Sequence, residues 1–416
     1  MSNTTLTADV VANEALMVLE NNLVMANLVH RAYEDEFDKT VNGYDVGETI
    51  SIRRPNQFTV RTGAVAAVQD VTEGKTSLTV NTQKGIDFKF SSADLTLKIS
   101  DLGERVMKPA LVRLADAIDQ DLMALYKYVP SWVGTPGQVV NSFADFAEGP
   151  KRLDHLAVPT DLRSAILSPN DHWGMLSSFT GLYIQDTAKT ALQRAKLPDI
   201  GGVTPYMAQN VPNHANGAGG ATGGSEGLVN GANQNVTYAS VKDSPTWSQS
   251  LITDDWDASE TIKQGDLFTI ANVYAVNPVN KATLDFLQQF VVVEDVTASG
   301  GGAATLKISP PIITSGPFQT VDSVPANDAQ LTRIGAESTA YRQNMVFHKN
   351  AFALVMVPMV KPPGAVDVAR KSHKGFSVRV IPYYDGTNDQ SSWRLDVLYG
   401  VKALDPKLAV RLSGTA

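Results

Sequence analysis

The sequence predicts an α+β protein of several domains that carries an inserted all-β segment. The chain of 416 residues exceeds the usual size of one domain. Apolar residues follow a helical period in some stretches and a strand period in others, and the two kinds of stretch do not alternate regularly. Residues 222–331 hold twelve acidic and four basic residues, which accounts for the whole net charge of −8. Such a sharp change in composition marks a separate domain.

The first element is an N-terminal helix. Apolar residues recur at steps of three and four from Val10 to Val24, which predicts a helix over residues 8–30 that Thr7 can cap. The acidic stretch Glu34–Asp38 is expected to follow the helix as a polar connecting segment.

Strands follow over residues 43–90. The stretches Thr49–Arg53, Phe58–Thr62, Leu78–Val80 and Ile86–Phe90 alternate polar and apolar residues. They predict one long two-stranded excursion with about 20 residues in each arm. An isolated two-stranded ribbon is marginally stable in water, so we expect another surface to cover it.

The strongest helical pattern lies in residues 94–128. Apolar residues fall every four positions from Leu102 to Leu122, with Asp116, Asp119 and Asp121 expected on other faces. Asp101 is a predicted N-cap. Pro109 predicts either a kink or the start of a second helical piece.

The remainder is mixed and contains the inserted segment. The stretch Ala165–Leu176 reads as a strand, a turn and the start of a helix. The glycine-rich stretch 216–224 reads as a linker. Beyond it, strands are expected at turn spacings typical of a barrel, and the last part of the chain adds four more. The expected strands are 236–241, 267–270, 273–276, 290–293, 305–308, 351–357, 376–381, 393–399 and 408–412.

Composition excludes several classes of protein. There is no cysteine, which removes disulfides, zinc–thiolate sites, iron–sulfur clusters and a cysteine nucleophile. No apolar run is long enough to span a membrane. The negative net charge argues against a surface that grips nucleic acid broadly.

Motifs that could carry chemistry are weak. Gly223–Gly227 matches the pattern around a hydrolase serine, here Ser225, but it lies in the expected linker without a strand before it. The pairs Asp154–His155 and Asp171–His172 could supply metal ligands, although nothing in their spacing brings them together. No catalytic residue, cofactor or metal is therefore predicted.

Two rival functions stay open on these residues. One is an enzyme that uses Ser225 or the Asp–His pairs. The other is a glycan-binding surface module in residues 222–331, with Trp247 and Trp256 as stacking platforms.

The order of the parts resembles the major capsid proteins of tailed phages, with their HK97-like fold, and most closely the P22-type coat proteins that carry an inserted domain. The motifs that carry the resemblance are Gly47–Pro55, Phe90–Leu95, Lys263–Pro278, Leu287–Val293 and Leu398–Val401. The resemblance implies an N-arm, an extended β loop, a long spine helix, peripheral and axial domains, and an inserted barrel-like domain. The corresponding segments are 1–42 (arm), 43–92 (extended loop), 93–130 (spine helix and peripheral domain), 131–221 and 333–416 (axial and peripheral domains) and 222–332 (insert).

The same resemblance implies function and partners. It implies a non-enzymatic protein that self-assembles, as hexamers and pentamers, into an icosahedral shell around double-stranded DNA. A scaffolding protein and a portal would take part during assembly in the host cytoplasm, packaged DNA would be contacted without sequence specificity, and a decoration protein is left open. The protein would reside in the virion. No Lys–Asn pair supports a covalent crosslink.

Charged residues supply the candidate assembly contacts. Acidic residues of the arm are expected to contact a basic scaffolding partner, or else to form solvated helix faces. Ribbon arginines are expected to meet carboxylates of a neighbouring copy, because no ribbon acid stands beside them, or else to be solvated charges on a strand face. A basic stretch near the end is expected to be a loop that pairs subunits or weakly contacts phosphate. These candidates are Asp9, Glu14, Glu20, Arg53, Arg54, Arg61, Arg370, Lys371 and Lys374.

Overall fold

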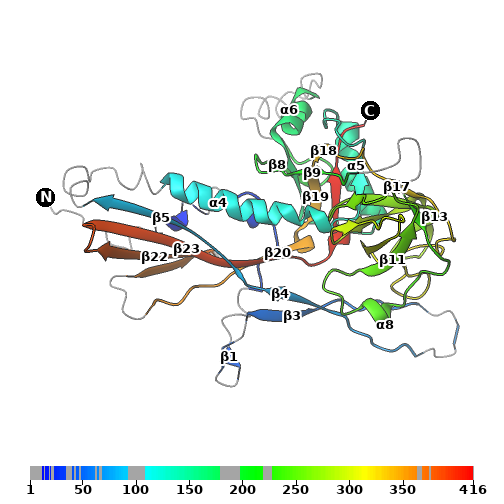
Figure 1. The fold of residues 1–416 in the computed structure, drawn as a ribbon, viewed down its shortest axis with the longest axis horizontal. Helices are drawn as coiled ribbons and strands as arrows, with labels where there is room; N and C mark the ends of the chain where they lie inside the picture. Colours follow the sequence, from blue (N-terminus) through cyan, green and yellow to red (C-terminus); the bar gives the residue numbers. More distant parts are fainter. Residues whose placement is uncertain are drawn as a thin grey trace. The chain divides into compact units, whose positions relative to one another are not determined.

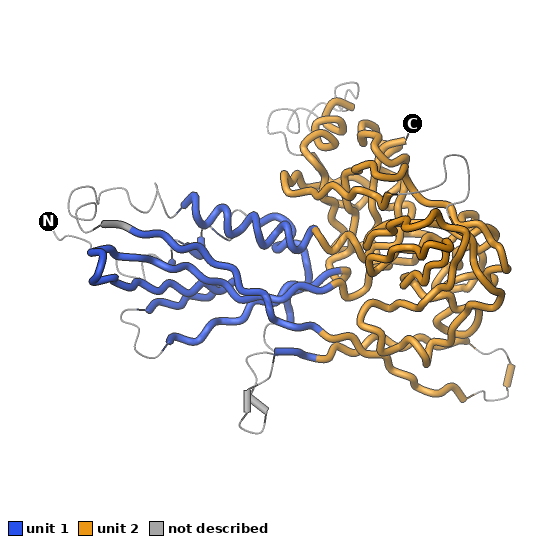
Figure 2. The backbone as a smooth tube through the Cα atoms, in the orientation of Figure 1, with its two compact units in different colours: residues 1–50, 78–123, 352–402 blue, residues 51–77, 124–351, 403–416 orange. Residues whose placement is uncertain are grey.

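The computed structural model divides the chain into two compact units (Figures 1 and 2). Unit 1 comprises residues 1–50, 78–123 and 352–402, and unit 2 comprises residues 51–77, 124–351 and 403–416. The structure describes residues 12–13, 15–17, 19, 23–33, 40–41, 44–45, 48–60, 63–64, 68–91, 108–178, 197–218, 227–362, 368–373 and 376–415. Among these residues, none of the helices is long and apolar enough to cross a membrane.

A sheet of five strands forms the frame of unit 1. Strand β23 (Gln390–Ala403) pairs with β5 (Thr82–Ser91), β22 (Phe376–Asp385) and β20 (Phe352–Met356), and β22 pairs onward with β21 (Ala369–His373). The strands predicted near 351–357, 376–381 and 393–399 are thus confirmed. The basic stretch expected as a loop is instead strand over residues 369–373, with Arg370 directly opposite Arg379.

Helix α4 (Lys108–Met123) lies along this sheet (Figure 1). Its apolar stripe is buried, as the periodicity predicted, and Leu111, Leu114, Ile118 and Leu122 are all at most 2% exposed. Pro109 stands in the first turn, where it removes no hydrogen bond. The chain then tightens into a 3₁₀ helix, η4 (Ala124–Tyr128), which belongs to unit 2. The expected cap Asp101 lies outside the described residues.

The arm does not run as one helix to residue 30. The described residues between 12 and 19 are helical, but residues 25–27 form a separate 3₁₀ turn, η1 (Met25–Asn27). His30 then bridges to Ala353 beside β20. The continuous helix expected over residues 8–30 is therefore wrong at its end, because long-range contacts hold residues 23–30 in another conformation.

The two-stranded excursion is shorter than expected. Strand β3 (Thr49–Arg53) pairs with β4 (Lys75–Thr79), whereas the described residues from 54 to 60 form no strand. The stretch 86–90 lies in β5 and pairs with β23, so it is not the second arm of the ribbon. Residues 49–53 and residues 86–90 show the same alternation of polar and apolar residues, but they pair with different strands. A short pair, β1 (Thr40–Val41) and β2 (Tyr44–Asp45), precedes the ribbon.

Unit 2 contains a second five-stranded sheet. Its strand order is β6 (Trp132–Val133), β24 (Ala409–Leu412), β19 (Asn344–His348), β7 (Arg163–Leu167) and β8 (Val203–Met207). Helix α5 (Phe143–His155) packs on β24, and α6 (Pro169–Ser178) packs on β7 and β8. The predicted strand, turn and helix start at 165–176 are confirmed.

The inserted segment of unit 2 is a closed β structure. Its six strands follow the order β10 (Leu228–Val229), β11 (Gln249–Asp254), β16 (Ala304–Ser309), β14 (Thr283–Val292), β13 (Leu267–Val276) and β17 (Leu331–Arg333). A bridge between Leu228 and Gln330 joins the last strand to the first. The apolar interior includes Leu251, Phe290 and Leu306, each 0% exposed. The predicted barrel is therefore observed.

One predicted strand of the insert is a helical turn instead. Residues 238–241 form α8 (Tyr238–Val241), preceded by Thr237 at the N-cap position. The Tyr238 ring stacks on Phe318 with centroids 3.5 Å apart. This aromatic contact, distant in sequence, favours a turn where the local alternation favours a strand. Smaller elements complete unit 2: β9 (Asn213–Ala215), β12 (Thr261–Ile262), β15 (Val296–Thr297), β18 (Ala340–Arg342), η6 (Lys349–Ala351) and η7 (Pro406–Leu408).

Candidate functional site

Some of the predicted assembly residues can be placed and others cannot. Arg53, Arg54, Arg370 and Lys371 are described. Asp9, Glu14, Glu20, Arg61 and Lys374 lie outside the described residues. The four that are described fall on two different elements, the ribbon and the β21 strand, and do not form one cluster.

Arg53 lies on the ribbon and pairs within it. Its guanidinium is 3.0 Å from Glu73, and the two side chains are 81% and 45% exposed. The premise that no ribbon acid stands beside the arginines is therefore wrong for Arg53. An ion pair this exposed contributes less than about 1 kcal/mol, so Arg53 can exchange partners at little cost.

Arg54 turns the other way and contacts the insert. Its Nη2 donates to the Ser244 carbonyl at 3.0 Å, and its guanidinium carbon lies 4.9 Å from the centre of the Trp247 ring. The Thr76 hydroxyl donates to the Pro245 carbonyl at 3.3 Å. We call this set of contacts, between ribbon residues 54 and 74–76 and insert residues 238–247, the ribbon dock.

Gly74 lets the ribbon backbone approach the insert backbone closely in the ribbon dock. A Cβ at this position would lie 2.6 Å from the Lys242 carbonyl oxygen and 2.8 Å from the Tyr238 hydroxyl. The Gly74 carbonyl also accepts from the Arg54 amide at 2.8 Å. Only glycine allows the two backbones to approach this closely. No local sequence pattern predicts this contact, since residues 74 and 242 are far apart in the chain.

The basic strand β21 presents an exposed cation. Arg370 donates to the Met359 carbonyl at 3.4 Å and is otherwise exposed. Beside it on β22, Arg379 donates to Asp396 at 2.6 Å, and Asp396 is 1% exposed. Arg379 is thus part of the fold, whereas Arg370 remains a candidate for an external contact.

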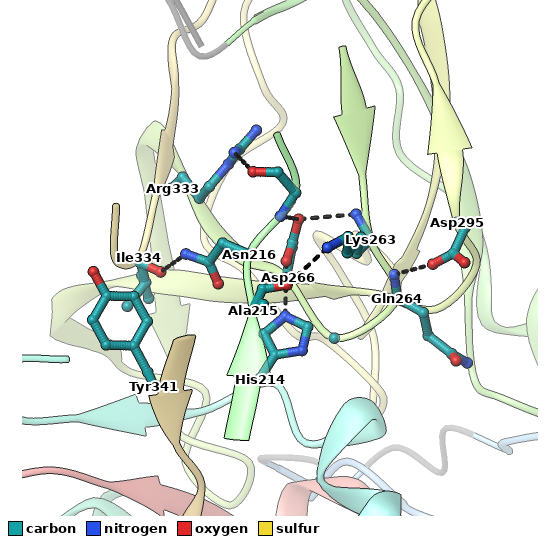
Figure 3. A network of polar contacts seen from close by, with 12 residues as sticks. His214, Ala215, Asn216, Lys263, Gln264, Asp266, Asp295, Arg333, Ile334 and Tyr341 are labelled. Atoms are coloured by element: carbon teal, nitrogen blue, oxygen red, sulfur yellow. Dashed lines mark hydrogen bonds and ion pairs between the residues drawn. The ribbon is translucent and has the colours of Figure 1, made fainter. Parts of the chain in front are cut away.

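A buried polar cluster joins the insert to the rest of unit 2 (Figure 3). The Asp266 carboxylate is 2.8 Å from His214 Nε2 and accepts from the Gly217 and Lys263 amides at 3.1 and 2.9 Å. Asn216 donates to the Ile334 carbonyl at 3.2 Å. The residues before and after the insert are thereby tied to each other, and we call this cluster the insert clasp.

A buried ion pair strengthens the insert clasp. Arg333 Nη2 donates to Glu260 at 2.6 Å, and the two side chains are 5% and 0% exposed. Arg333 Nη1 also donates to the Gly217 carbonyl at 3.2 Å. Burial raises the pKa of Glu260, while the arginine opposes that shift. This ion pair links distant residues of the insert, and no local sequence pattern predicts it.

Arg411 of β24 is also buried near the insert clasp. It is 0% exposed, donates to the Gly265 carbonyl at 2.8 Å and lies 5.2 Å from the Tyr126 ring centre. Burial lowers the pKa of Arg411 to about 9, although nearby Tyr126 and Asp266 oppose this shift. The end of the chain is therefore fastened to the loop that begins β13.

Asp119 anchors the arm in unit 1. Its carboxylate accepts from the Val24 amide at 2.6 Å and from the Ala26 amide at 3.1 Å. Asp119 is 2% exposed, so the expectation that it faces away from the core is wrong. Its position four residues after Ala115 and three before Leu122 is the signal that places it on the buried face.

The residues of the rival functions are not assembled into a site. Asp154 pairs with Arg163 at 2.7 Å, and Asp171 accepts from the Val140 amide at 2.9 Å. In the described part of the chain, no group of three or more metal-ligating side chains comes together. Trp256 is 6% exposed within the barrel interior, so it offers no stacking platform. Ser225 lies outside the described residues.

Comparison with known proteins decides between these readings. The family model "P22 coat protein - gene protein 5" matches residues 1–414. The chain belongs to the P22 coat protein family. It is a phage coat protein, and its copies form the capsid shell. The rival hydrolase and glycan-binding readings have no support.

Individual relatives agree with the family. The chain is 23% identical over 388 residues to the major capsid protein of Acyrthosiphon pisum secondary endosymbiont phage 1, and the match covers 89% of this chain and 90% of the relative. A solved structure from Mycobacterium phage Che8 is similar with a TM-score of 0.50 and 13% identity, over 94% of this chain and 90% of that one. The predicted HK97-like fold is therefore confirmed for this coat protein.

Proposed function

We propose that the ribbon supplies an assembly contact that a single copy of the coat protein leaves uncovered. The carrying observation is the exposure of apolar side chains beyond the paired part of the ribbon. Val60 is 98% exposed, Val68 93%, Val71 65% and Phe58 60%. Apolar side chains in one short segment, outside any described strand, favour burial against another surface.

Burial of these side chains would favour association. Apolar surface removed from water stabilises a complex by about 25 cal/mol per Å². Repetition around a closed shell gives each copy several such contacts, so modest individual contacts add up. Arg53 can add an ion pair to a neighbouring carboxylate in exchange for its exposed pair with Glu73.

Further partners follow from membership of a coat protein family. We propose assembly through hexamers and pentamers in the host cytoplasm, with a scaffolding protein and a portal, around double-stranded DNA. Asp9, Glu14 and Glu20 are the proposed scaffold contacts on the arm, and Arg61 extends the ribbon contact. Arg370, Lys371 and Lys374 are proposed to pair subunits, with weak contact to packaged phosphates as the alternative. A decoration protein stays open, and no catalytic role is proposed.

A double substitution tests the ribbon contact. We expect Val60→Ser with Val68→Ser to reduce the yield of shells at least about tenfold, because apolar cover is lost while the fold of the free chain is untouched. Negative-stain electron microscopy and sedimentation measure the shells, and circular dichroism checks the fold.

The matched control is Ile252→Ser, which changes another exposed apolar residue, 52% exposed on the insert. We expect the control to assemble like the unmodified protein. Full shell yield from the Val60–Val68 variant would contradict the proposed contact.

A further inference from the structure

Two cationic side chains, Arg54 and Lys407, lie against the Trp247 ring of the ribbon dock, and a third, Lys281, is close enough to Lys407 for the two charges to interact. Arg54 belongs to the ribbon, Lys281 to the turn between β13 and β14, and Lys407 to η7. Lys407 Nζ lies 5.1 Å and the Arg54 guanidinium carbon 4.9 Å from the Trp247 ring centre. Burial lowers the pKa of Lys281, and the neighbouring charge of Lys407 lowers it further. We call these three residues the cation cluster.

Four donors, on Arg54 and Lys281 of the cation cluster and on the neighbouring Trp247, lack acceptors among the residues that the structure describes. Nε and Nη1 of Arg54, Nζ of Lys281 and Nε1 of Trp247 are hidden from solvent and have no hydrogen-bond partner within the described chain. All four are donors. Leaving a buried charged donor without an acceptor is unfavourable, so this region favours a ligand that only accepts hydrogen bonds.

The nearby carboxylates do not fill this need. Asp243 and Asp405 act on Arg54 through space. However, Asp243 pairs with Lys242 at 2.7 Å, and Asp405 accepts from the Lys407 backbone amide at 3.2 Å, where it caps η7. The cation cluster therefore retains an excess of positive charge and of donors.

We propose that the cation cluster is a binding site for a small oxyanion of the phosphate class. A tetrahedral oxyanion accepts several charge-assisted hydrogen bonds at once, which suits unpartnered donors that come from separate segments of the chain. The donor atoms are hidden from solvent, which favours a small free anion over the phosphates of a double helix, because a double helix is too large to reach buried atoms. The bound anion would link the ribbon, the insert and the C-terminal segment, and so hold the ribbon dock together.

Phosphate titration of the full, unassembled chain tests the proposal. Inorganic phosphate is compared with chloride at equal ionic strength, which removes the effect of general screening. We expect calorimetry to detect phosphate binding and the thermal midpoint to rise with phosphate concentration. Absence of a phosphate-specific effect on the unmodified chain would overturn the proposal without bearing on shell assembly.

Two variants locate the site. Lys281→Met and Lys407→Met keep the aliphatic stems but remove the charge, and we expect each to weaken phosphate binding at least about tenfold. The matched control is Lys151→Met, which removes an exposed lysine paired with Glu148 at 3.0 Å and is expected to bind phosphate normally. Equal phosphate affinity in all three variants would place the anion elsewhere and contradict the assignment. If one variant fails to fold, the other still decides between these outcomes.

Discussion

Single buried charges hold the ends of segments in this coat protein. The Asp119 carboxylate accepts hydrogen bonds from the backbone amides of residues 24 and 26. Arg411 donates a hydrogen bond to the backbone carbonyl of residue 265. Both groups contact backbone rather than an opposite charge, so burial shifts their pKa values toward neutrality. A change in the protonation of Asp119 or Arg411 is therefore expected to change how strongly the attached segment is held.

The arm anchor has a defined pH dependence. Burial raises the pKa of Asp119 from 3.8 to about 6. The folded state therefore holds a proton more readily than the unfolded state, and this stabilisation is lost as the pH rises through about 6. Between pH 5 and pH 7 we expect the group to remove about 1 kcal/mol from the free energy of unfolding.

Denaturant unfolding of the free chain at pH 5 and at pH 7 measures this change in the free energy of unfolding. Asp119→Asn is expected to abolish the contribution, whereas Asp116→Asn, which keeps the anchoring carboxyl, should preserve it. An identical slope in the unmodified chain and in Asp119→Asn would show that Asp119 does not titrate in this range.

The buried pair in the insert clasp predicts a larger effect. Glu260→Gln removes the carboxylate that pairs with the buried Arg333, and we expect the loss of this buried pair to cost about 3 kcal/mol of unfolding free energy. Replacing Arg333 by Met in the same chain should recover part of the loss, because no charge is then left unpaired. Urea unfolding provides the measurement.

The comparison is Glu294→Gln, which breaks the exposed pair with Lys307. We expect this change to alter the free energy of unfolding by less than about 1 kcal/mol. Equal destabilisation by the two glutamate substitutions would contradict the role assigned to the insert clasp.

At the scale of elements, the close approach at Gly74 orients the ribbon. Gly74→Ala places a methyl group against the Lys242 carbonyl, and overpacking of this kind costs about 1–3 kcal/mol. Hydrogen exchange at the Arg54 amide, which donates to Gly74, should become about ten- to a hundredfold faster. Mass spectrometry of the exchanged chain reads this directly.

Gly300→Ala serves as the control, because a Cβ there meets nothing within 4 Å. Exchange near Arg54 should stay unchanged in this variant. Unaltered exchange in Gly74→Ala as well would mean that the ribbon is held by other contacts.

Elements with strong local patterns could be predicted, and their partners could not. The apolar stripe of α4 and the barrel strands followed from periodicity. By contrast, β5 carries the alternation expected of a ribbon arm but pairs with β23, about 300 residues away. Alternation identifies a strand and does not name its neighbour. The turn α8 likewise depends on the distant ring of Phe318.

The candidate site was predictable in its residue types and not in its pairings. Arg53 and Arg54 are adjacent in sequence, yet one meets Glu73 on the ribbon and the other Trp247 on the insert. Strand β3 ends at Arg53, so Arg54 is not bound by the pairing of β3 with β4 and contacts the insert instead. The acidic residues 222–331 contain most of the closed β structure, whereas the buried Glu260–Arg333 pair had no local signal.

For the whole molecule, we propose that a single copy is incomplete until other copies cover its ribbon. Its closed barrel and two sheets have apolar interiors, but Val60 and Val68 remain almost fully exposed. A shell of many copies offers each ribbon a surface to cover these residues. Folding within a copy and association between copies are then consecutive uses of the same hydrophobic driving force.

Hydrogen exchange over residues 58–71, compared between the free chain and assembled shells, tests this account most directly. We predict rapid exchange in the free chain and at least about a hundredfold slower exchange in the shell, because a neighbouring copy covers the segment. Slow exchange in the free chain, or equally rapid exchange in both states, would contradict it.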